Sequence, residues 1–451
     1  MMPHPFPPRP DRRAFLGAAA AGSALAGASL VGGDAHAAAV AAETFGVRPD
    51  GSDQTAALQR ALDAAAAAGR PLALAPGDTV SATLRLPAGT SLVGPRTARL
   101  RQGSAGPLLR AEGIGAARIA GITLQGLGAG SGGAALIDAE AVPELVVEDV
   151  ALEDAPGVAL LLSRCGGRVA TCAIARADVA LFSTDATGLL VAGNAIADCL
   201  NNGVLIWRSQ KGFDGAQVVG NRIERIAARG GGTGQRGNGV NVFRAGGVVV
   251  ADNVMVDCAY SAVRNNAGDG VQIVSNHARA SGENAIFVEF GFEGAIIASN
   301  VVDGASSGIS CSNLNEGGRL CVVSGNVVRN IVRTVAPEPE DTGFTFGIAV
   351  EGDATVIGNV VEGTPDHGIR AGWGPYLRDV AITGNVVRDC GFGIGVSVVE
   401  GVGAVLVATN LISGARRGAI VGERWREVVS DDLARDAGRF PHLTVTGNAV
   451  A

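Results

Sequence analysis

A short pattern of apolar and polar positions recurs along the chain from about residue 190 onward. Each copy has apolar residues, a small residue, an asparagine and two more apolar residues, as in VVSGNVV at 322–328. Weaker copies lie upstream at 118–125, 144–152 and 168–174. The asparagines are 23 to 38 residues apart and stand at Asn194, Asn221, Asn253, Asn276, Asn300, Asn326, Asn359, Asn385, Asn410 and Asn448. The pattern predicts one structural unit repeated about every 25 residues.

A second pattern, a small residue followed by alternating branched aliphatic residues, comes after each of the first nine asparagines. It begins 8 or 9 residues later, except after Asn221 and Asn326, where the offsets are 18 and 21. Short β-branched runs between Gly, Asn and Asp are typical of stacked strands. Leucine-rich and helical repeats need frames that this region lacks. The sequence therefore predicts an all-β fold, a right-handed single-stranded parallel β-helix of about 11–13 coils.

The recurring asparagine has a structural interpretation. Asn tolerates the left-handed backbone of a tight turn, and asparagines stacked about 4.8 Å apart can bond to one another as a ladder. Cys199, Cys258 and Cys390 each follow an asparagine by five residues, so they are expected to be small buried side chains rather than metal ligands or disulfides. A single disulfide, either Cys165–Cys172 or Cys311–Cys321, stays open as an alternative.

Composition narrows the functional classes. Hydrophobic residues make up 47% of the chain but aromatic residues only 4%, so the core material is small and aliphatic. The net charge is −7 and there is no basic run, which excludes nucleic acid as an expected partner. Seven cysteines in 451 residues are too few for a disulfide scaffold.

The first 37 residues have the organisation of an export signal. The segment DRRAFLG at 11–17 precedes an Ala/Gly-rich apolar run, which ends at the small-x-small sequence Ala35-His36-Ala37. This arrangement resembles a twin-arginine translocation signal; a Sec signal or a membrane anchor is the alternative. The resemblance implies the twin-arginine translocase as a partner and a periplasmic or secreted protein. No later stretch reaches 18 uninterrupted apolar residues, so no membrane contact is expected after signal removal.

Residues 38–110 are expected to form an amino-terminal cap and the first coils, and residues 111–451 the repeats. The segment TFGVRPDGSDQTAALQ at 44–59 leads into an Ala-rich helix with Asp53 as its expected cap. This order resembles the amino-terminal cap of the pectate-lyase-like superfamily, in which a helix plugs the first coil. Together with the signal and the Asn-centred repeat, the chain resembles a family of twin-arginine-translocated repetitive proteins of Gram-negative bacteria. That family's repeat is described as cofactor-binding; it implies no catalytic residues and leaves the cofactor unidentified.

Two loop insertions mark a candidate binding face. They lie at Ala227–Asn238 and Arg333–Phe346, four coils apart at the same corner, where insertions commonly wall a binding surface. Between them, outward positions of the second strand carry aromatic, amide and charged side chains suited to a sugar polymer or an anionic group. The expected ligand-binding residues are Trp207, Arg208, Asn241, Phe243, Arg244, Arg264, Asn266 and Arg370.

Glu289 and Glu351 share a position two coils apart, about 9.6 Å between backbones. That separation suits the acid and base of an inverting glycosidase, so both are candidate catalytic residues. The alternative is that Glu289 pairs with Arg264, and Glu351 with a neighbouring Arg, as solvated surface ion pairs. The histidines beyond residue 37 lack metal-ligand spacing, so no metal is expected.

A short amphipathic helix near 422–439 is expected to cover the last coils. The sequence as a whole favours an exported β-helix that binds a carbohydrate polymer or another anionic ligand. In one version of this hypothesis the protein also cleaves the polymer, as a lyase or glycoside hydrolase. The alternative is a non-enzymatic protein that handles a cofactor or serves assembly.

Overall fold

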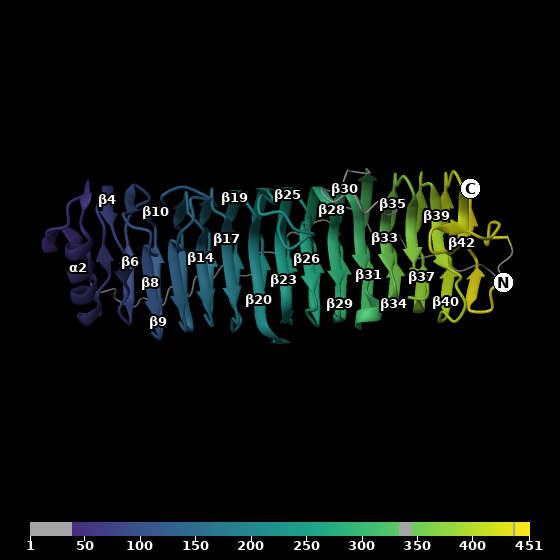
Figure 1. Cartoon of the computed structure of the whole chain (residues 1–451), viewed down its shortest axis with the longest axis horizontal. Helices are drawn as coiled ribbons and strands as arrows, with labels where there is room; N and C mark the ends of the chain where they lie inside the picture. Colours follow the sequence, from purple (N-terminus) through teal and green to yellow (C-terminus); the bar gives the residue numbers. More distant parts are fainter. Residues whose placement is uncertain (1–37, 333–344, 436–437) are drawn as a thin grey trace, which may run out of the picture. The chain divides into compact units, whose positions relative to one another are not determined.

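The computed structural model describes residues 38–332, 345–435 and 438–451. These residues form about 14 turns of a right-handed parallel β-solenoid, whose strands stack along one axis, with one α-helix near its amino-terminal end (Figure 1). The predicted fold class is confirmed. The turns outnumber the expected 11–13 because the solenoid begins at residue 40, well before the first ladder asparagine, Asn194. The predicted export signal, residues 1–37, lies outside the described residues.

Each turn contributes strands to three parallel stacks, here called sheets 1, 2 and 3 in chain order. Sheet 1 precedes the asparagine turn and has 16 strands in the described part of the chain. They are β1 Val40–Ala41, β3 Leu72–Ala73, β6 Thr90–Val93, β9 Ala116–Ala120, β12 Glu144–Glu148, β15 Gly167–Ala170, β18 Leu190–Ala192, β21 Gln217–Val219, β24 Val249–Ala251, β27 Val271–Val274, β29 Glu293–Ala298, β31 Arg319–Ser324, β34 Gly352–Ile357, β37 Arg378–Thr383, β40 Val405–Ala408 and β44 Leu443–Thr446.

Sheet 2 follows the asparagine turn. Its strands are β2 Asp50–Asp53, β4 Gly77–Ser81, β7 Ala98–Gln102, β10 Thr123–Gln125, β13 Ala151–Glu153, β16 Ala173–Ala175, β19 Ala195–Cys199, β22 Arg222–Ile226, β25 Val254–Cys258, β32 Val327–Ile331, β35 Val360–Glu362, β38 Val386–Arg388, β41 Leu411–Ser413 and β45 Ala449–Val450. Two long strands, β28 His277–Glu289 and β30 Val301–Cys311, run through sheet 2 and continue into sheet 3.

Sheet 3 carries the second sequence pattern. Its strands are β5 Leu84–Arg85, β8 Leu109–Glu112, β11 Ile137–Glu140, β14 Val158–Ser163, β17 Val179–Thr184, β20 Asn202–Phe213, β23 Asn238–Gly246, β26 Val263–Asn266, β33 Phe346–Val350, β36 His367–Ala371, β39 Phe392–Ser397 and β42 Gly418–Arg424. Because its strands pair in register from turn to turn, equivalent side chains align in columns along the solenoid axis.

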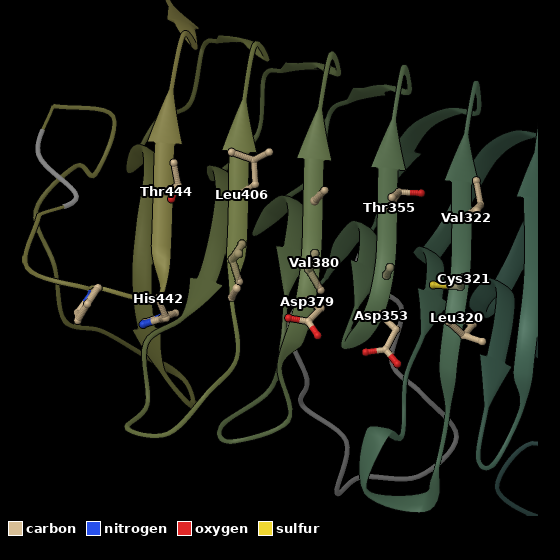
Figure 2. A pocket seen from close by; sticks show the side chains of 15 residues that line it. Leu320, Cys321, Val322, Asp353, Thr355, Asp379, Val380, Leu406, His442 and Thr444 are labelled. Atoms are coloured by element: carbon tan, nitrogen blue, oxygen red, sulfur yellow. The ribbon is translucent and has the colours of Figure 1, made fainter.

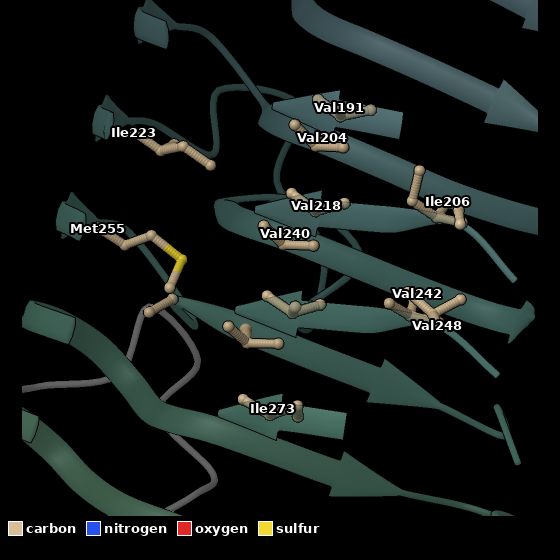
Figure 3. Close-up of a cluster of buried hydrophobic side chains, with 14 of the residues drawn as sticks. Val191, Val204, Ile206, Val218, Ile223, Val240, Val242, Val248, Met255 and Ile273 are labelled. Carbon is tan, nitrogen blue, oxygen red and sulfur yellow. The ribbon is translucent and has the colours of Figure 1, made fainter. Parts of the chain in front are cut away.

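Small aliphatic side chains from all three sheets fill the interior. Val218 of sheet 1, Ile223 of sheet 2 and Val240 of sheet 3 are fully buried and come from one turn (Figure 3). The preceding turn contributes Val191 and Val204, and the following turn contributes Met255. A channel this narrow has little room for aromatic rings, which explains why the chain has so few.

The predicted asparagine ladder is present and continuous. From Asn194 to Asn410, each side-chain amide donates to the Oδ1 of the next asparagine at 2.9–3.0 Å. The same Oδ1 accepts the backbone N–H of the preceding asparagine, for example Asn276 Oδ1 from Asn253 at 3.1 Å. Cys199, Cys258 and Cys390 are buried as expected.

The expected helix at the head of the solenoid is α2, Thr55–Ala67. It buries Leu58 and Leu62 against the first turns. Gln54 stands at the cap position, but Asp53 Oδ1 accepts the N–H of Thr55 at 2.9 Å, so the acidic residue still satisfies the first turn. No helix in the described ranges has both the length and the apolar composition needed to cross a bilayer.

The prediction of a helix near 422–439 is wrong for the described residues of that segment. The chain turns at Trp425, whose φ is 58°, and forms an antiparallel hairpin of β42 with β43, Glu427–Val428. Asp432 then accepts the N–H groups of Ala419 and Ile420 at 3.0 and 3.2 Å. This hairpin gives hydrogen-bond acceptors to backbone N–H groups of β42, the last strand of sheet 3. A helix on that surface would leave those N–H groups without acceptors.

Candidate functional site

The outward side chains of sheet 3, from β17 to β42, are here called the sheet 3 face. The strand pairing places Leu205, Asn241, Arg264, Phe287, Ser310, Ala349 and Arg370 in one column, and Trp207, Phe243, Asn266 and Glu289 in the next. Sequence alternation therefore placed the expected ligand-binding residues on one face of successive turns.

Three aromatic rings contact one another at one end of this face, the first pair edge to face with an interplanar angle of 75° and the second pair tilted at 54°. Phe182, Trp207 and Phe243 lie on consecutive turns, with ring centroids 5.0 and 5.2 Å apart, and each is half-buried. The Arg244 guanidinium lies 4.7 Å from the centre of the Phe243 ring. We call these four residues the aromatic platform. Trp207 pairs in register with Phe243, whereas Phe182 pairs with Leu205 and contacts Trp207 from the neighbouring column. Strand pairing fixes the backbone of all three residues, so the platform is preorganised.

The basic residues next to the platform have acidic neighbours. Arg208 Nη1 lies 3.8 Å from Asp214 Oδ2, and Lys211 Nζ lies 2.8 Å from Asp269 Oδ1. The Asp214 side chain is fully buried, and burial raises the pKa of this carboxyl to about 6. Oδ2 of Asp214 accepts no hydrogen bond within the described residues, so its charge is poorly compensated.

An ion-pair cluster occupies the centre of the face. Arg264 binds Glu289 with two hydrogen bonds, Nε to Oε1 at 2.6 Å and Nη2 to Oε2 at 3.0 Å. Glu283 accepts from Arg264 at 3.1 Å, and Asn266 donates to Glu289 at 3.2 Å. Arg264 is 7% exposed and Glu289 is 3% exposed, so the pair is shielded from solvent.

The first loop insertion covers this cluster. The loop between β22 and β23 brings Gly234 so close to Arg264 that a Cβ at Gly234 would lie 1.6 Å from Nη1 of the guanidinium. Tyr260 donates to the carbonyl of Gly232 at 2.7 Å and fixes the loop there. Most of the second insertion, residues 333–344, lies outside the described residues.

A second cluster lies four turns further along the face. Arg370 Nε donates to Glu423 Oε2 at 3.1 Å and Nη2 donates to the carbonyl of Trp425 at 2.8 Å, while its guanidinium lies 4.6 Å from the Trp373 ring centre. His367 Nε2 lies 2.5 Å from Glu423 Oε1. Both His367 and Glu423 are buried.

Sequence reasoning missed His367 and Glu423 as members of this cluster. They meet across two turns because the intervening residue is Gly395, where a Cβ would lie 2.7 Å from the His367 ring. A lone glycine in an otherwise filled column was the available signal.

The two candidate catalytic residues differ in their surroundings. Glu289 is engaged by Arg264 and Asn266, whereas Glu351 accepts the backbone N–H of Leu314 at 2.8 Å. Burial raises the pKa of the Glu351 carboxyl above its ordinary value. The Arg264–Glu289 ion pair that the sequence offered as the alternative is formed. Two hydrogen bonds from Arg264 and one from Asn266 occupy the Glu289 carboxylate, so the geometry does not favour Glu289 in catalysis.

No group of three His, Cys, Asp or Glu side chains in residues 38–332, 345–435 and 438–451 is arranged to hold a metal ion.

A shallow groove of about 590 Å³ lies on sheet 1, over β31, β34, β37, β40 and β44 (Figure 2). Leu320, Val322 and Leu406 give it an apolar floor. Asp353 lines one edge, where hydrogen bonds from Arg378 at 2.7 Å lower the pKa of this carboxyl to about 2. Asp379 and His442 also line the groove.

Comparisons with known proteins agree with the architecture. Residues 202–378 match the profile of the family described as "Right handed beta helix region". Similar solved structures include the catalytic unit of a GH87 α-1,3-glucanase from Streptomyces thermodiastaticus, with 15% identity over 92% of this chain and 69% of that one, and a TM-score of 0.50. The surface adhesin PfbA of Streptococcus pneumoniae (12% identity, 86% and 91% coverage, TM-score 0.43) is another, as is the periplasmic alginate epimerase AlgG (10% identity, 85% and 77% coverage, TM-score 0.42).

No curated protein matches the sequence. Identities this low bear on fold alone and carry no activity to this chain. The solenoid, its continuous asparagine ladder and the matched region together make the chain a right-handed parallel β-helix protein by fold.

Proposed function

We propose that this β-helix binds a neutral carbohydrate polymer along the sheet 3 face. The aromatic platform carries the proposal. Phe182, Trp207 and Phe243 present half-buried rings on three consecutive turns, with ring centroids 5.0 and 5.2 Å apart. Aromatic rings pack against the apolar CH faces of sugars, and the neighbouring exposed Arg244 can donate to hydroxyls.

The charges of the face favour a neutral ligand over an anionic one. The two arginines best placed to bind uronate or phosphate, Arg264 and Arg370, are engaged by the buried carboxylates of Glu289 and Glu423. An anionic group would have to displace these carboxylates, which leaves a buried charge without its partner at a cost of about 3–5 kcal/mol. The remaining ligand-binding candidates, Arg208 and Asn266, likewise have acidic neighbours.

The proposal is one of binding rather than cleavage. Catalysis by Glu289 and Glu351 needs both carboxylates free to exchange a proton with the substrate, and Glu289 is bound to Arg264. Glu289→Gln and Glu351→Gln are therefore expected to leave glycan binding at the platform unchanged.

Titration calorimetry with soluble neutral glucans and with polyuronides tests the proposal. Trp207→Ala removes the central ring and should weaken glucan binding about tenfold, the equivalent of about 1–1.5 kcal/mol. Ile296→Ala, which truncates a 44% exposed side chain on sheet 1, is the matched control and should bind as the wild type does. Absence of glucan binding, or tighter binding of polyuronides that survives Trp207→Ala, would overturn the proposal.

We further propose that the chain is exported folded through the twin-arginine route, as a periplasmic or secreted member of the twin-arginine-translocated repetitive family. Arg12 and Arg13, with the cleavage sequence ending at Ala37, support this. Replacing both arginines by lysine should retain the unprocessed chain in the cytoplasm. Unchanged export of that variant would point to the Sec route instead.

A further inference from the structure

The outward side of sheet 1 carries exposed aliphatic side chains in register over eight described strands, β24 to β44. We call the outward side chains of these strands the sheet 1 face. Ile296 and Ile357, which lie in two neighbouring columns, are 44% and 47% exposed. Figure 2 shows Val322, Thr355 and Leu406 of the first column in line along the groove. Strand pairing gives that column as Val249, Gln272, Ile296, Val322, Thr355, Ala381, Leu406 and Thr444.

Four charged side chains alternate in sign beside the start of these strands. They come from consecutive turns in the order Glu293, Arg319, Asp353 and Arg378, and we call them the charge row. Arg319 Nη1 lies 2.7 Å from Glu293 Oε1 and its Nε lies 2.8 Å from Asp353 Oδ2, while Arg378 Nε lies 2.7 Å from Asp353 Oδ1. The side chains at the two ends, Glu293 and Arg378, are 56% and 47% exposed, so each can meet a further partner from outside the chain.

The charge row is complementary to itself about one two-fold axis. This axis runs parallel to the strands, midway between β31 and β34, and turns the sheet 1 face of one copy onto the same face of a second copy with the solenoid axes antiparallel. It sets β31 opposite β34 and β29 opposite β37. Glu293 then faces Arg378 of the second copy, and Arg319 faces Asp353 of the second copy. Every charge of the row therefore meets one of opposite sign.

The same axis sets large side chains opposite small ones. Ile296, on β29, faces Ala381 of the second copy, which lies on β37 within the groove. Ile357, on β34, faces Ser324 of the second copy on β31. The most exposed aliphatic side chain of each column thus has room to enter the opposite face, which is the shape match that a packed interface requires.

The sheet 1 face is also large enough for a specific contact. Eight strands about 4.8 Å apart extend about 38 Å along the solenoid, and an average strand of about five residues extends about 17 Å across it. Two such faces bury about 1,300 Å² in total, which lies in the range of specific interfaces. Asp379, another exposed acid of the groove, faces Gly294 of the second copy, so it meets no like charge there.

We propose that this protein forms a two-fold dimer through the sheet 1 face, with antiparallel solenoid axes and the two charge rows in contact. Removal of the exposed isoleucines from water drives the association. The charge rows select the orientation, because only the antiparallel arrangement brings one row onto the other. The sheet 3 face lies outside this contact, so the dimer does not rest on carbohydrate binding.

Sedimentation equilibrium across a range of protein concentrations tests the proposal. The wild-type protein should sediment with twice the mass of one chain at high concentration. Glu293→Arg sets like charges opposite each other at both ends of the two rows, and so does Arg378→Glu, so each variant alone should dimerise about tenfold more weakly. An equimolar mixture of the two variants places opposite charges at every position again, and it should associate as the wild type does.

Two further variants separate this interface from a general effect of charge. Arg388→Glu reverses the charge of a 52% exposed arginine on sheet 2 and should dimerise as the wild type does. Ala381→Phe fills the space that Ile296 enters and should weaken the dimer about tenfold. A wild-type monomer at every concentration, an assembly larger than a dimer, or a mixture no better associated than its separate variants would overturn the proposal.

Discussion

Replacing one asparagine in the middle of the ladder should destabilise the protein far more than replacing the last one. Asn276 is 2% exposed and makes four hydrogen bonds through its side chain. It accepts from the backbone N–H and the side chain of Asn253 at 3.1 and 2.9 Å, and it donates to Val250 O at 2.9 Å and to Asn300 Oδ1 at 3.0 Å.

In Asn276→Ala the buried N–H of Asn253 is left without an acceptor, which costs about 1–3 kcal/mol. The other three hydrogen bonds are also lost, but their partner groups keep a second hydrogen bond or can move to find one. Each of these losses costs about 0.5–1.5 kcal/mol. The free energy of unfolding should therefore fall by about 2.5–7.5 kcal/mol. Asn448→Ala removes the last member of the ladder, which is partly exposed, so water replaces its bonds and the loss should stay near 1 kcal/mol.

Urea unfolding followed by far-UV circular dichroism measures both losses. The two variants are compared by the shift in their urea midpoint, with the same dependence of the unfolding free energy on urea concentration used for both. This choice is made because a solenoid can unfold in more than two states. Equal shifts for the two variants would show that the ladder contributes little beyond its backbone turns, and would refute the reasoning.

Two further predictions concern buried charge. The pKa of Asp214 is raised by burial from 3.8 to about 6, so the stability that its protonated form provides is complete below pH 3.8 and is lost as pH rises through 6. Asp214→Asn should then stabilise the protein by up to about 3 kcal/mol at pH 7.5 and hardly at all at pH 4, measured by urea midpoints; an equal effect at both pH values would contradict the assignment. Arg264→Met should cost about 3–5 kcal/mol because it leaves Glu289 buried and unpaired, and adding Glu289→Leu should restore most of the loss in thermal unfolding. A double variant as unstable as the sum of the single ones would show that the two residues do not act as a pair.

The repeat made the fold and the composition of the face predictable. A stacked turn must place equivalent residues above one another, so the spacing from Asn194 to Asn448 determines the ladder, and alternation along each sheet 3 strand determines which side chains point outward. The Arg264–Glu289 pair followed from the same rule, since the two residues lie on adjacent turns.

What the repeat could not predict are contacts that break it. His367 contacts Glu423, which lies two turns away, across the intervening Gly395. A rule that compares only adjacent turns does not find such a contact. The segment after β42 has spacings that fit a helix, but the unpaired N–H groups of the last sheet 3 strand select a hairpin instead. At the end of a stack of strands, the unpaired backbone N–H groups determine the structure more strongly than the local apolar spacing does.

Hydrogen–deuterium exchange with and without the glucan that binds best tests the central claim most directly. A polymer on the sheet 3 face should slow exchange in β17, β20 and β23, around the aromatic platform, and should leave the sheet 1 groove over β31 and β34 unchanged. Protection confined to that groove, or none at saturating glucan, would contradict the account.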